Sequence, residues 1–196
     1  MLKIGITGGM GTGKTTVCKI FEHLHIPTYY ADERAKHLIN TELVGEISKV
    51  FGTDVYKDNV LQNKVLAARA FISKVEIEKL NSIVHPAVAR DYDIWQKEQT
   101  SPYTLKEAAL LIESKSYLLL DKLIVVSAPL DICIARVMAR NGFSRKEILS
   151  RIDKQMPQAE KNKYADYIIK NDGNESLIHQ VKKIHAKILG VFNNVQ

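Results

Sequence analysis

Residues 8–16 read Gly-Gly-Met-Gly-Thr-Gly-Lys-Thr-Thr and decide the fold of this chain. They match the pattern G-x-x-x-x-G-K-[ST], in which glycines let backbone N–H groups converge on a phosphate and the lysine adds a positive charge. Apolar residues alternate over residues 2–6 as in a strand, and they recur at helical spacing over residues 17–24. The alternative is a glycine-rich turn that only caps a helix. The strand-loop-helix context favours a phosphate-binding loop, called the P-loop below.

Length and composition predict one globular domain with room for inserted subdomains, and the strand-loop-helix pattern around the P-loop predicts the α/β class. The 196 residues are 45% hydrophobic and carry a net charge of +6. No apolar run approaches the length of about 18 residues that indicates a membrane helix, and residues 1–7 resemble a strand rather than a signal peptide. We therefore expect a cytoplasmic protein without a membrane partner, in which Cys18 and Cys133 are reduced thiols.

The positive charge fits either nucleic acid or small anionic substrates. The Lys and Arg residues are spread along the chain, without a dense basic block or a basic stretch interleaved with aromatic residues. The P-loop already accounts for one polyanion. We expect nucleotides as ligands and no nucleic-acid partner.

Residues 26–30 form a short β-prone run, and a helical pattern extends from Ala31 to Ile39. Asp32 therefore stands where a strand ends and a helix begins. In open parallel sheets this edge binds ligands, and the P-loop leaves the sheet at the same edge. Asp32 is either a helix N-cap or a catalytic carboxylate.

Residues 41–99 show helical periodicity without a convincing long strand. This is too much chain for one crossover helix, so we expect a helical insertion that builds a substrate pocket. The dipeptide His85-Pro86 is expected to interrupt a helix, because proline lacks the N–H donor. His85 is either a ligand donor or a structural histidine.

Further strands are expected at residues 103–108 and 123–127. Between them, Glu113 follows an apolar run, as either a substrate-binding carboxylate or a polar helix start. A helix over residues 132–140 carries Arg136 and Arg140. Ser144 should begin a second helix that carries Arg151 and Gln155 until Pro157 ends it.

Two helices joined by a short turn and presenting arginines are suited to a lid that closes on a transferring phosphate. A solvated basic face is the alternative. Residues 165–170 are expected to form the fifth strand, and residues 177–188 the closing amphipathic helix.

Taken together, these motifs resemble the dephospho-coenzyme A kinase family over nearly the whole chain. The least common of the shared motifs are the His-Pro pair, the Leu-Leu-x-Glu run and the final Ala-Asp to Asn-x-Gly segment. The matching stretches are residues 7–14, Ala31-Asp32 with Ala35, Phe51-Gly52, residues 80–86, residues 110–113, Arg136 with Arg140, Arg151-Ile152-x-x-Gln155, and residues 165–173.

The resemblance implies a P-loop kinase core with a five-stranded parallel sheet, a helical region at about 32–95 that binds coenzyme A, and a lid at about 136–160. It implies ATP and dephospho-coenzyme A as substrates and Mg²⁺ as cofactor. The resemblance also implies roles for individual residues of the core, the helical region and the lid. They are Asp32 as base, with Lys14 and Arg140 as the other catalytic residues; Gly9, Met10, Gly11, Thr12, Gly13, Lys14, Thr15, Thr16 and Asn171 for ATP; Thr15 for the metal; and His85 and Glu113 for the substrate.

The chain departs from the family pattern at three positions, with Tyr30, Asn63 and Ala109 where the family often has aspartate, arginine and proline. The base at Asp32 is retained, so activity is still expected. Because Asn63 replaces an arginine, we expect Lys64 or Arg69 to contact the substrate phosphates.

The expected mechanism is in-line phosphoryl transfer, in which positioning and charge stabilisation do most of the catalysis. The rivals are another small-molecule kinase acting on nucleosides or nucleoside monophosphates, and a nucleotide-dependent switch protein. Against the switch, residues 63–66 lack the aspartate of the guanine-reading motif Asn-Lys-x-Asp. We expect a monomer or weak homo-oligomer.

Overall fold

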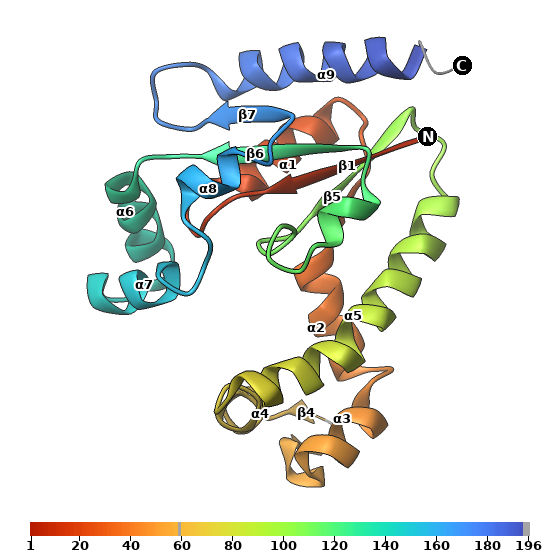
Figure 1. Ribbon diagram of the computed structural model, residues 1–196, viewed down its shortest axis with the longest axis vertical. Coiled ribbons are helices and arrows are strands. Elements are labelled where there is room, and N and C mark those ends of the chain that lie inside the picture. Colours follow the sequence, from red (N-terminus) through yellow and green to blue (C-terminus); the bar gives the residue numbers. More distant parts are fainter. Residues whose placement is uncertain (59, 194–196) are drawn as a thin grey trace. The chain divides into compact units, whose positions relative to one another are not determined.

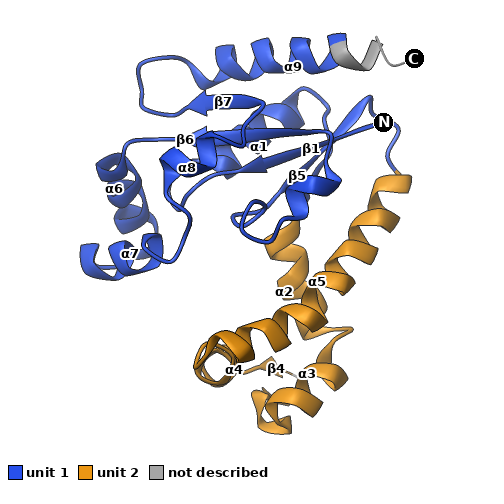
Figure 2. Ribbon diagram, viewed as in Figure 1, with its two compact units in different colours: residues 1–30, 99–196 blue, residues 31–98 orange. Residues whose placement is uncertain are grey.

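The computed structural model describes residues 1–58 and 60–193, and the chain divides into two compact units. Unit 1 comprises residues 1–30 and 99–196, and unit 2 comprises residues 31–98 (Figure 2). The two units contain separate clusters of buried apolar side chains.

Unit 1 is built on a five-stranded sheet in the order β2-β5-β1-β6-β7. Every neighbouring pair of strands is parallel, so the predicted five-stranded parallel sheet is confirmed. The strands are β1 (Leu2–Thr7), β2 (Thr28–Tyr30), β5 (Tyr103–Glu107), β6 (Lys122–Ser127) and β7 (Tyr167–Lys170).

The register brings the carboxyl ends of the strands to one edge of the sheet. Glu107, the last residue of β5, pairs with Ile6 near the end of β1 and with Tyr30 at the end of β2. Ser127 at the end of β6 pairs with Lys170 at the end of β7. The loops that follow β1, β5, β6 and β7 therefore all leave from this edge, where ligands bind in open α/β sheets.

Helices pack on this sheet and extend beyond its carboxyl edge. Buried side chains of α1 and α9 share a core with the strands, centred on residues such as Ile4, Phe21 and Val181. In Figure 1 the arrowheads of β6 and β7 point toward the side on which α6 and α7 lie. The helices of unit 1 are α1 (Lys14–His23), η2 (Ser116–Leu119), α6 (Leu130–Asn141), α7 (Arg145–Ile152), α8 (Gln158–Asn162) and α9 (Leu177–Asn193).

Helices α6 and α7 have a small core of their own, in which Ile134, Val137 and Ile148 are buried. The predicted capping box is confirmed, since Ser144 and Glu147 each accept a hydrogen bond from the other's backbone N–H. The prediction that this helix carries Gln155 is wrong. Helix α7 ends at Ile152, and Gln155 lies in the connection that leads to α8.

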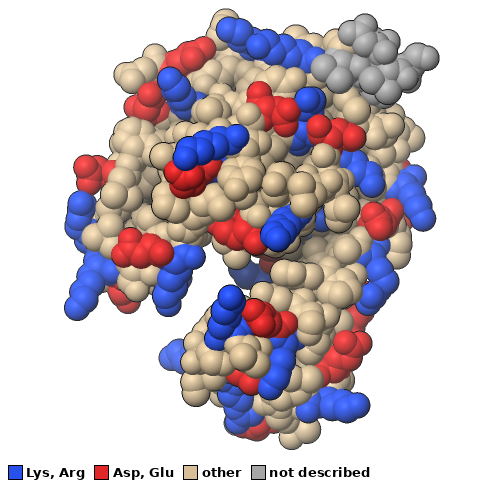
Figure 3. Space-filling view, in the orientation of Figure 1, with Lys and Arg blue, Asp and Glu red and all other residues tan. Residues whose placement is uncertain are grey.

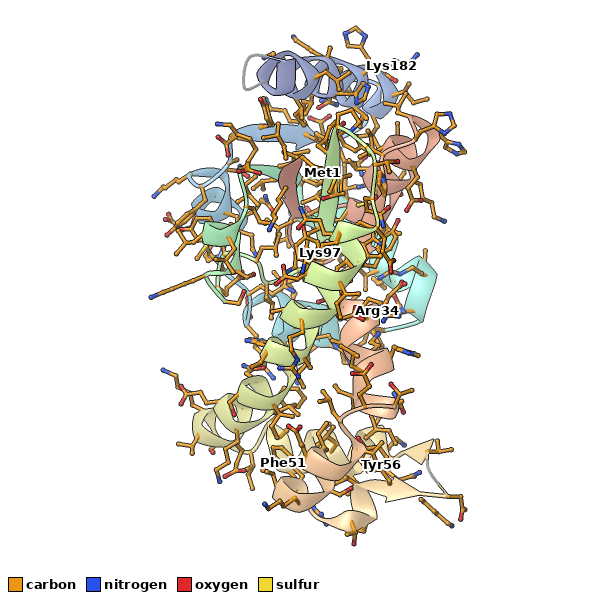
Figure 4. The ribbon with its side chains drawn as sticks, turned by 90° about the vertical axis from the view of Figure 1, so that its right-hand side faces the viewer. Met1, Arg34, Phe51, Tyr56, Lys97 and Lys182 are labelled. Carbon is orange, nitrogen blue, oxygen red and sulfur yellow. The ribbon has the colours of Figure 1, made fainter. Side chains whose placement is uncertain are left out.

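Unit 2 is mainly helical and packs around side chains such as Leu38, Ile47, Phe51 and Val84. Phe51 and Tyr56 are labelled in this unit in Figure 4, where Arg34 marks α2. A two-stranded hairpin, which the helical periodicity did not predict, lies among the helices. The elements are α2 (Ala31–Asn40), α3 (Val44–Phe51), η1 (Thr53–Val55), β3 (Tyr56–Lys57), β4 (Val60–Leu61), α4 (Asn63–Ala70) and α5 (Lys74–Lys97).

Helix α5 corrects the prediction that His85-Pro86 interrupts a helix. The helix runs through Pro86 for 24 residues. A proline removes one backbone hydrogen bond, and the apolar contacts of Val84 and Ala87 in the core of unit 2 hold the helix on both sides of it. Within residues 1–58 and 60–193, no helix is both long enough and apolar enough to cross a bilayer.

Candidate active site

The P-loop joins β1 to α1 in a conformation that depends on glycine. Gly13 caps α1 with a φ of 95°, and Gly11 has a φ of 80°, which are left-handed values that favour glycine. A Cβ on Gly11 would lie 2.5 Å from the backbone oxygen of Cys133. Thr12 is buried, and its hydroxyl donates to the Gly9 carbonyl at 2.9 Å. The loop is therefore closed by its own contacts.

Lys14 folds its side chain back over this loop. Its Nζ donates to the carbonyl oxygens of Gly8 at 3.0 Å and Gly9 at 3.4 Å, and it lies 3.9 Å from Oε1 of Glu107. Only 12% of the lysine side chain is exposed. The positive charge is thus held where the P-loop and the end of β5 meet.

Glu107 is a site residue that the sequence analysis missed. It is 7% exposed and ends a strand whose five residues are all buried. A carboxylate that ends an otherwise buried strand, at the ligand-binding edge of a parallel sheet, was the available signal.

Thr15 and Thr16 are exposed in the first turn of α1. Among the described residues, no three or more His, Cys, Asp or Glu side chains form a group that could hold a metal. Mg²⁺ is usually held by one or two protein oxygens together with waters and substrate phosphates. The Thr15 hydroxyl and the Glu107 carboxylate are oxygen donors that fit this type of site.

Asn171 ties the loop after β7 to the P-loop. Its Nδ2 donates to the Thr12 carbonyl at 2.8 Å, and its Oδ1 accepts from Arg136 on α6 at 3.1 Å. The same Arg136 nitrogen also donates to the Asn171 carbonyl. The other terminal nitrogen of Arg136 is buried without a partner among the described residues, so a donor is left over beside the P-loop.

Glu113 is bound to Lys161, a lysine of α8 whose side chain has no exposed surface. The Lys161 ammonium donates to Glu113 Oε1 at 2.6 Å and to the Ala109 carbonyl at 3.1 Å. The Met156 N–H also donates to Glu113 Oε1. Glu113 lies in a turn rather than at a helix start, so that alternative from the sequence is wrong.

The pKa of Glu113 reflects this environment. Partial burial raises the pKa, but the hydrogen bond from Lys161 and the backbone hydrogen bonds outweigh burial, and the pKa lies below its usual range. The carboxylate is therefore charged at neutral pH and anchors the α8 segment to the loop that follows β5.

The remaining predicted residues are exposed or already bonded within their own unit. In unit 1, Arg140 is exposed on α6 and donates to the Asn141 side chain at 2.9 Å. In unit 2, Asp32 lies in the first turn of α2, and His85 and Lys64 are exposed. Arg69 donates both terminal nitrogens to the Asp54 carboxylate, at 2.7 and 2.6 Å, and so has a structural partner.

The fold and the P-loop together define a P-loop kinase, an ATP-dependent phosphotransferase. The chain belongs to the dephospho-CoA kinase family, because the family model described as Dephospho-CoA kinase matches residues 2–176.

Individual proteins are also similar to this chain in sequence or in structure. The dephospho-CoA kinase of Bacteroides fragilis is 34% identical over 188 residues, covering 94% of this chain and 92% of that protein. A Thermus thermophilus crystal structure is similar with a TM-score of 0.87 and 30% identity, covering 95% and 97% of the two chains. The dephospho-CoA kinase structure from Campylobacter jejuni gives a TM-score of 0.61 at 25% identity, covering 95% and 96%.

We predict that Lys14→Ala lowers turnover by about 10²-fold or more, as for removal of a preorganised charge-stabilising group. The reason is that the ammonium is held against the loop that receives the phosphates. Steady-state kinetics at saturating ATP test this, and near-normal turnover would remove Lys14 from the active site.

We predict that Glu113→Gln lowers the free energy of unfolding by about 3 kcal/mol at neutral pH, because it leaves the buried Lys161 ammonium without a counter-charge. Denaturant titration measures this. Because the folded pKa of Glu113 is lowered, its stabilisation is present above the unfolded pKa and is lost as the pH falls through the folded pKa. The difference from wild type should therefore shrink in acid.

The matched control is Glu160→Gln, which breaks the surface ion pair with Lys163. Both of those side chains are at least half exposed, so a change within about 0.5 kcal/mol is expected. Equal effects of the two substitutions would contradict the anchoring role of Glu113.

Proposed function

We propose that the chain transfers the γ-phosphoryl group of ATP to the ribose 3′-hydroxyl of dephospho-CoA, giving CoA and ADP in the last step of coenzyme A biosynthesis. The observation that carries this proposal is a complete P-loop with its lysine in place, in a chain of the dephospho-CoA kinase family. The family gives the acceptor, and the loop gives the chemistry.

The P-loop residues 9–16 bind the phosphates of ATP. The backbone N–H groups of Gly9 and Met10 donate to Gln158 and Gln155, so the later N–H groups of the loop and the positive end of the α1 dipole are the ones proposed to favour an anion at this point. Lys14 offsets charge on the β- and γ-phosphates, and Arg140 reaches the transferring group from the lid. When bound, Mg²⁺ would be held by Thr15 and Glu107 and would neutralise charge on the phosphates.

Asp32 is proposed as the base that orients and deprotonates the ribose hydroxyl. It follows the last residue of β2 by two positions, and β2 ends at the same register as Glu107. A carboxylate close after the ligand-binding edge of a parallel sheet is suited to this role.

Unit 2 is proposed to bind the remainder of dephospho-CoA, with His85 and Lys64 as exposed donors. Arg69 is less suited than Lys64, since its guanidinium already holds Asp54 and the Phe51 carbonyl. Glu113 is proposed to contact the substrate through Oε2, because Lys161 and Met156 bond to its Oε1 and the side chain is partly exposed.

The base of ATP is proposed to lie near Asn171 and Arg136. The supporting observation is that Asn171 lies beside the P-loop, where it donates to the Thr12 carbonyl and accepts from Arg136.

Nucleotide substrates rather than nucleic acid also fit the surface. Basic and acidic side chains are interspersed over unit 1 on the face shown in Figure 3, which presents no long basic stripe. The expected cytoplasmic location and the expected monomer or weak homo-oligomer remain predictions.

The proposed function is tested with an acceptor panel of dephospho-CoA, adenosine and AMP at matched ATP and Mg²⁺. The kcat/KM for dephospho-CoA should exceed the others by several orders of magnitude, because binding energy from the remote pantetheine and pyrophosphate groups orients the ribose hydroxyl. NMR should place the new phosphate on the ribose 3′-oxygen. Equal efficiency with AMP, or phosphate at another position, would favour a nucleotide kinase.

A further inference from the structure

The P-loop is held from outside by two glutamines. The N–H of Gly9 donates to Oε1 of Gln158 at 3.2 Å, and the N–H of Met10 donates to Oε1 of Gln155 at 3.1 Å. Gln155 and Gln158 lie in residues 153–162, called the 153–162 segment, which connects α7 to α8 and includes α8. Two consecutive N–H groups of the loop are therefore bound by one distant segment.

The same two peptide groups also hold Lys14. In the Gly8–Gly9 peptide, the carbonyl accepts from Lys14 Nζ and the N–H donates to Gln158. In the Gly9–Met10 peptide, the carbonyl accepts from Lys14 Nζ and the N–H donates to Gln155. In a planar trans peptide the C=O and N–H point in opposite directions, so fixing one direction fixes the other. The glutamines thus set the direction of the carbonyls that hold the ammonium.

Glycine makes this restraint necessary. Two of the three residues in these peptides are Gly8 and Gly9, which have no side chain to limit their backbone angles. The Gly9 carbonyl also accepts from the Thr12 hydroxyl, so the external acceptor matters most for the Gly8–Gly9 peptide, which could otherwise rotate and carry its carbonyl away from Lys14. Side-chain amides supply acceptors without placing a negative charge beside the phosphates.

The 153–162 segment is itself fixed to unit 1. Lys161 bonds to Glu113 and to the Ala109 carbonyl, which also accepts from Thr7, the residue before the P-loop. The Gln158 amide is oriented by Nε2 donation to Asn162 at 2.9 Å. The glutamine oxygens are therefore presented by an anchored segment rather than by free side chains.

A second contact joins the P-loop to helices α6 and α7. Met10 packs against the buried core of α6 and α7, as does Ile152. A cavity of about 240 Å³ is lined by Gly9, Met10 and Thr12 of the P-loop, by the start of α6 and by the two glutamines. The P-loop is thus joined to the expected lid by both backbone hydrogen bonds and apolar packing.

We propose that Gln155 and Gln158 are positioning residues for phosphoryl transfer, which act through the Gly8–Gly9 and Gly9–Met10 peptides to hold the Lys14 ammonium at the phosphate site. This inference rests on the proposed function only in that ATP is the phosphoryl donor. It does not depend on the acceptor.

The test compares Gln155→Ala and Gln158→Ala with wild type and with Lys163→Ala, an exposed control that only breaks a surface ion pair. ATP affinity is measured by calorimetry without acceptor, and kcat is measured at saturating ATP. Each glutamine variant should lose about tenfold in kcat/KM for ATP, as for loss of one hydrogen bond that positions a charge. The KM for the acceptor and the affinity of Lys163→Ala should not change.

The deciding comparison repeats both substitutions in a Lys14→Met background. If the glutamines act through Lys14, they should cost little further there, because coupled residues are non-additive. The proposal would be overturned if the substitutions lowered kcat/KM for ATP by the same factor with and without Lys14. It would also be overturned if, with Lys14 present, kcat/KM stayed within twofold of wild type. The thermal unfolding midpoint of each variant covers poor folding of the alanine variants, because a loss of kcat/KM without a fall in the midpoint is a positioning effect.

The two proposals fail in different ways. Weak transfer to dephospho-CoA, together with the predicted losses in the Gln155→Ala and Gln158→Ala variants, would count against the proposed acceptor alone. Unchanged ATP affinity and turnover in the glutamine variants, with normal transfer to dephospho-CoA, would count against the positioning role alone.

Discussion

The parallel pairing of β1 between β5 and β6 is the constraint on which the phosphate site depends. Because all five strands run the same way, their carboxyl ends deliver the P-loop, Glu107, the α6 connection and Asn171 to one edge. Each of these groups ends or follows a strand whose residues are fixed by ladder hydrogen bonds. Chemistry that needs several groups within a few ångströms can therefore be assembled from segments far apart in the sequence.

Buried polar contacts then determine how the loops at this edge lie. Lys161 has no exposed side-chain surface, and its bonds to Glu113 and Ala109 join α8 to the loop after β5. Asn171 joins the loop after β7 to the P-loop and to Arg136. A buried charge that loses its partner is costly, so these contacts also define which arrangement of the loops is stable. The anchored 153–162 segment can consequently hold the P-loop glycines in place.

The sequence predicted the features that have a local signature. The P-loop, the five strands and the Ser144 capping box each depend on neighbouring residues, and the structure confirms the sheet and the box. The sequence did not reveal that Lys161 is buried or that Gln155 and Gln158 bind the P-loop, because those contacts join residues more than 40 positions apart. Pro86 misled the prediction for α5, since tertiary packing of the helix outweighs one lost hydrogen bond. The roles of Asp32, His85, Lys64 and Arg140 come from the family resemblance and remain proposals.

The central claim is that Asp32 acts as the base that deprotonates the ribose hydroxyl of the acceptor, while the P-loop holds the ATP whose γ-phosphoryl group that hydroxyl attacks. The most direct measurement is the pair of ATP affinity and single-turnover transfer rate for Asp32→Asn, since the amide keeps the shape of the side chain but cannot accept the proton. The account predicts unchanged ATP affinity and a transfer rate lower by about 10²-fold or more, the usual contribution of a general base. A transfer rate equal to wild type, with ATP affinity intact, would contradict it and leave Asp32 as a residue of the first turn of α2 without a catalytic role.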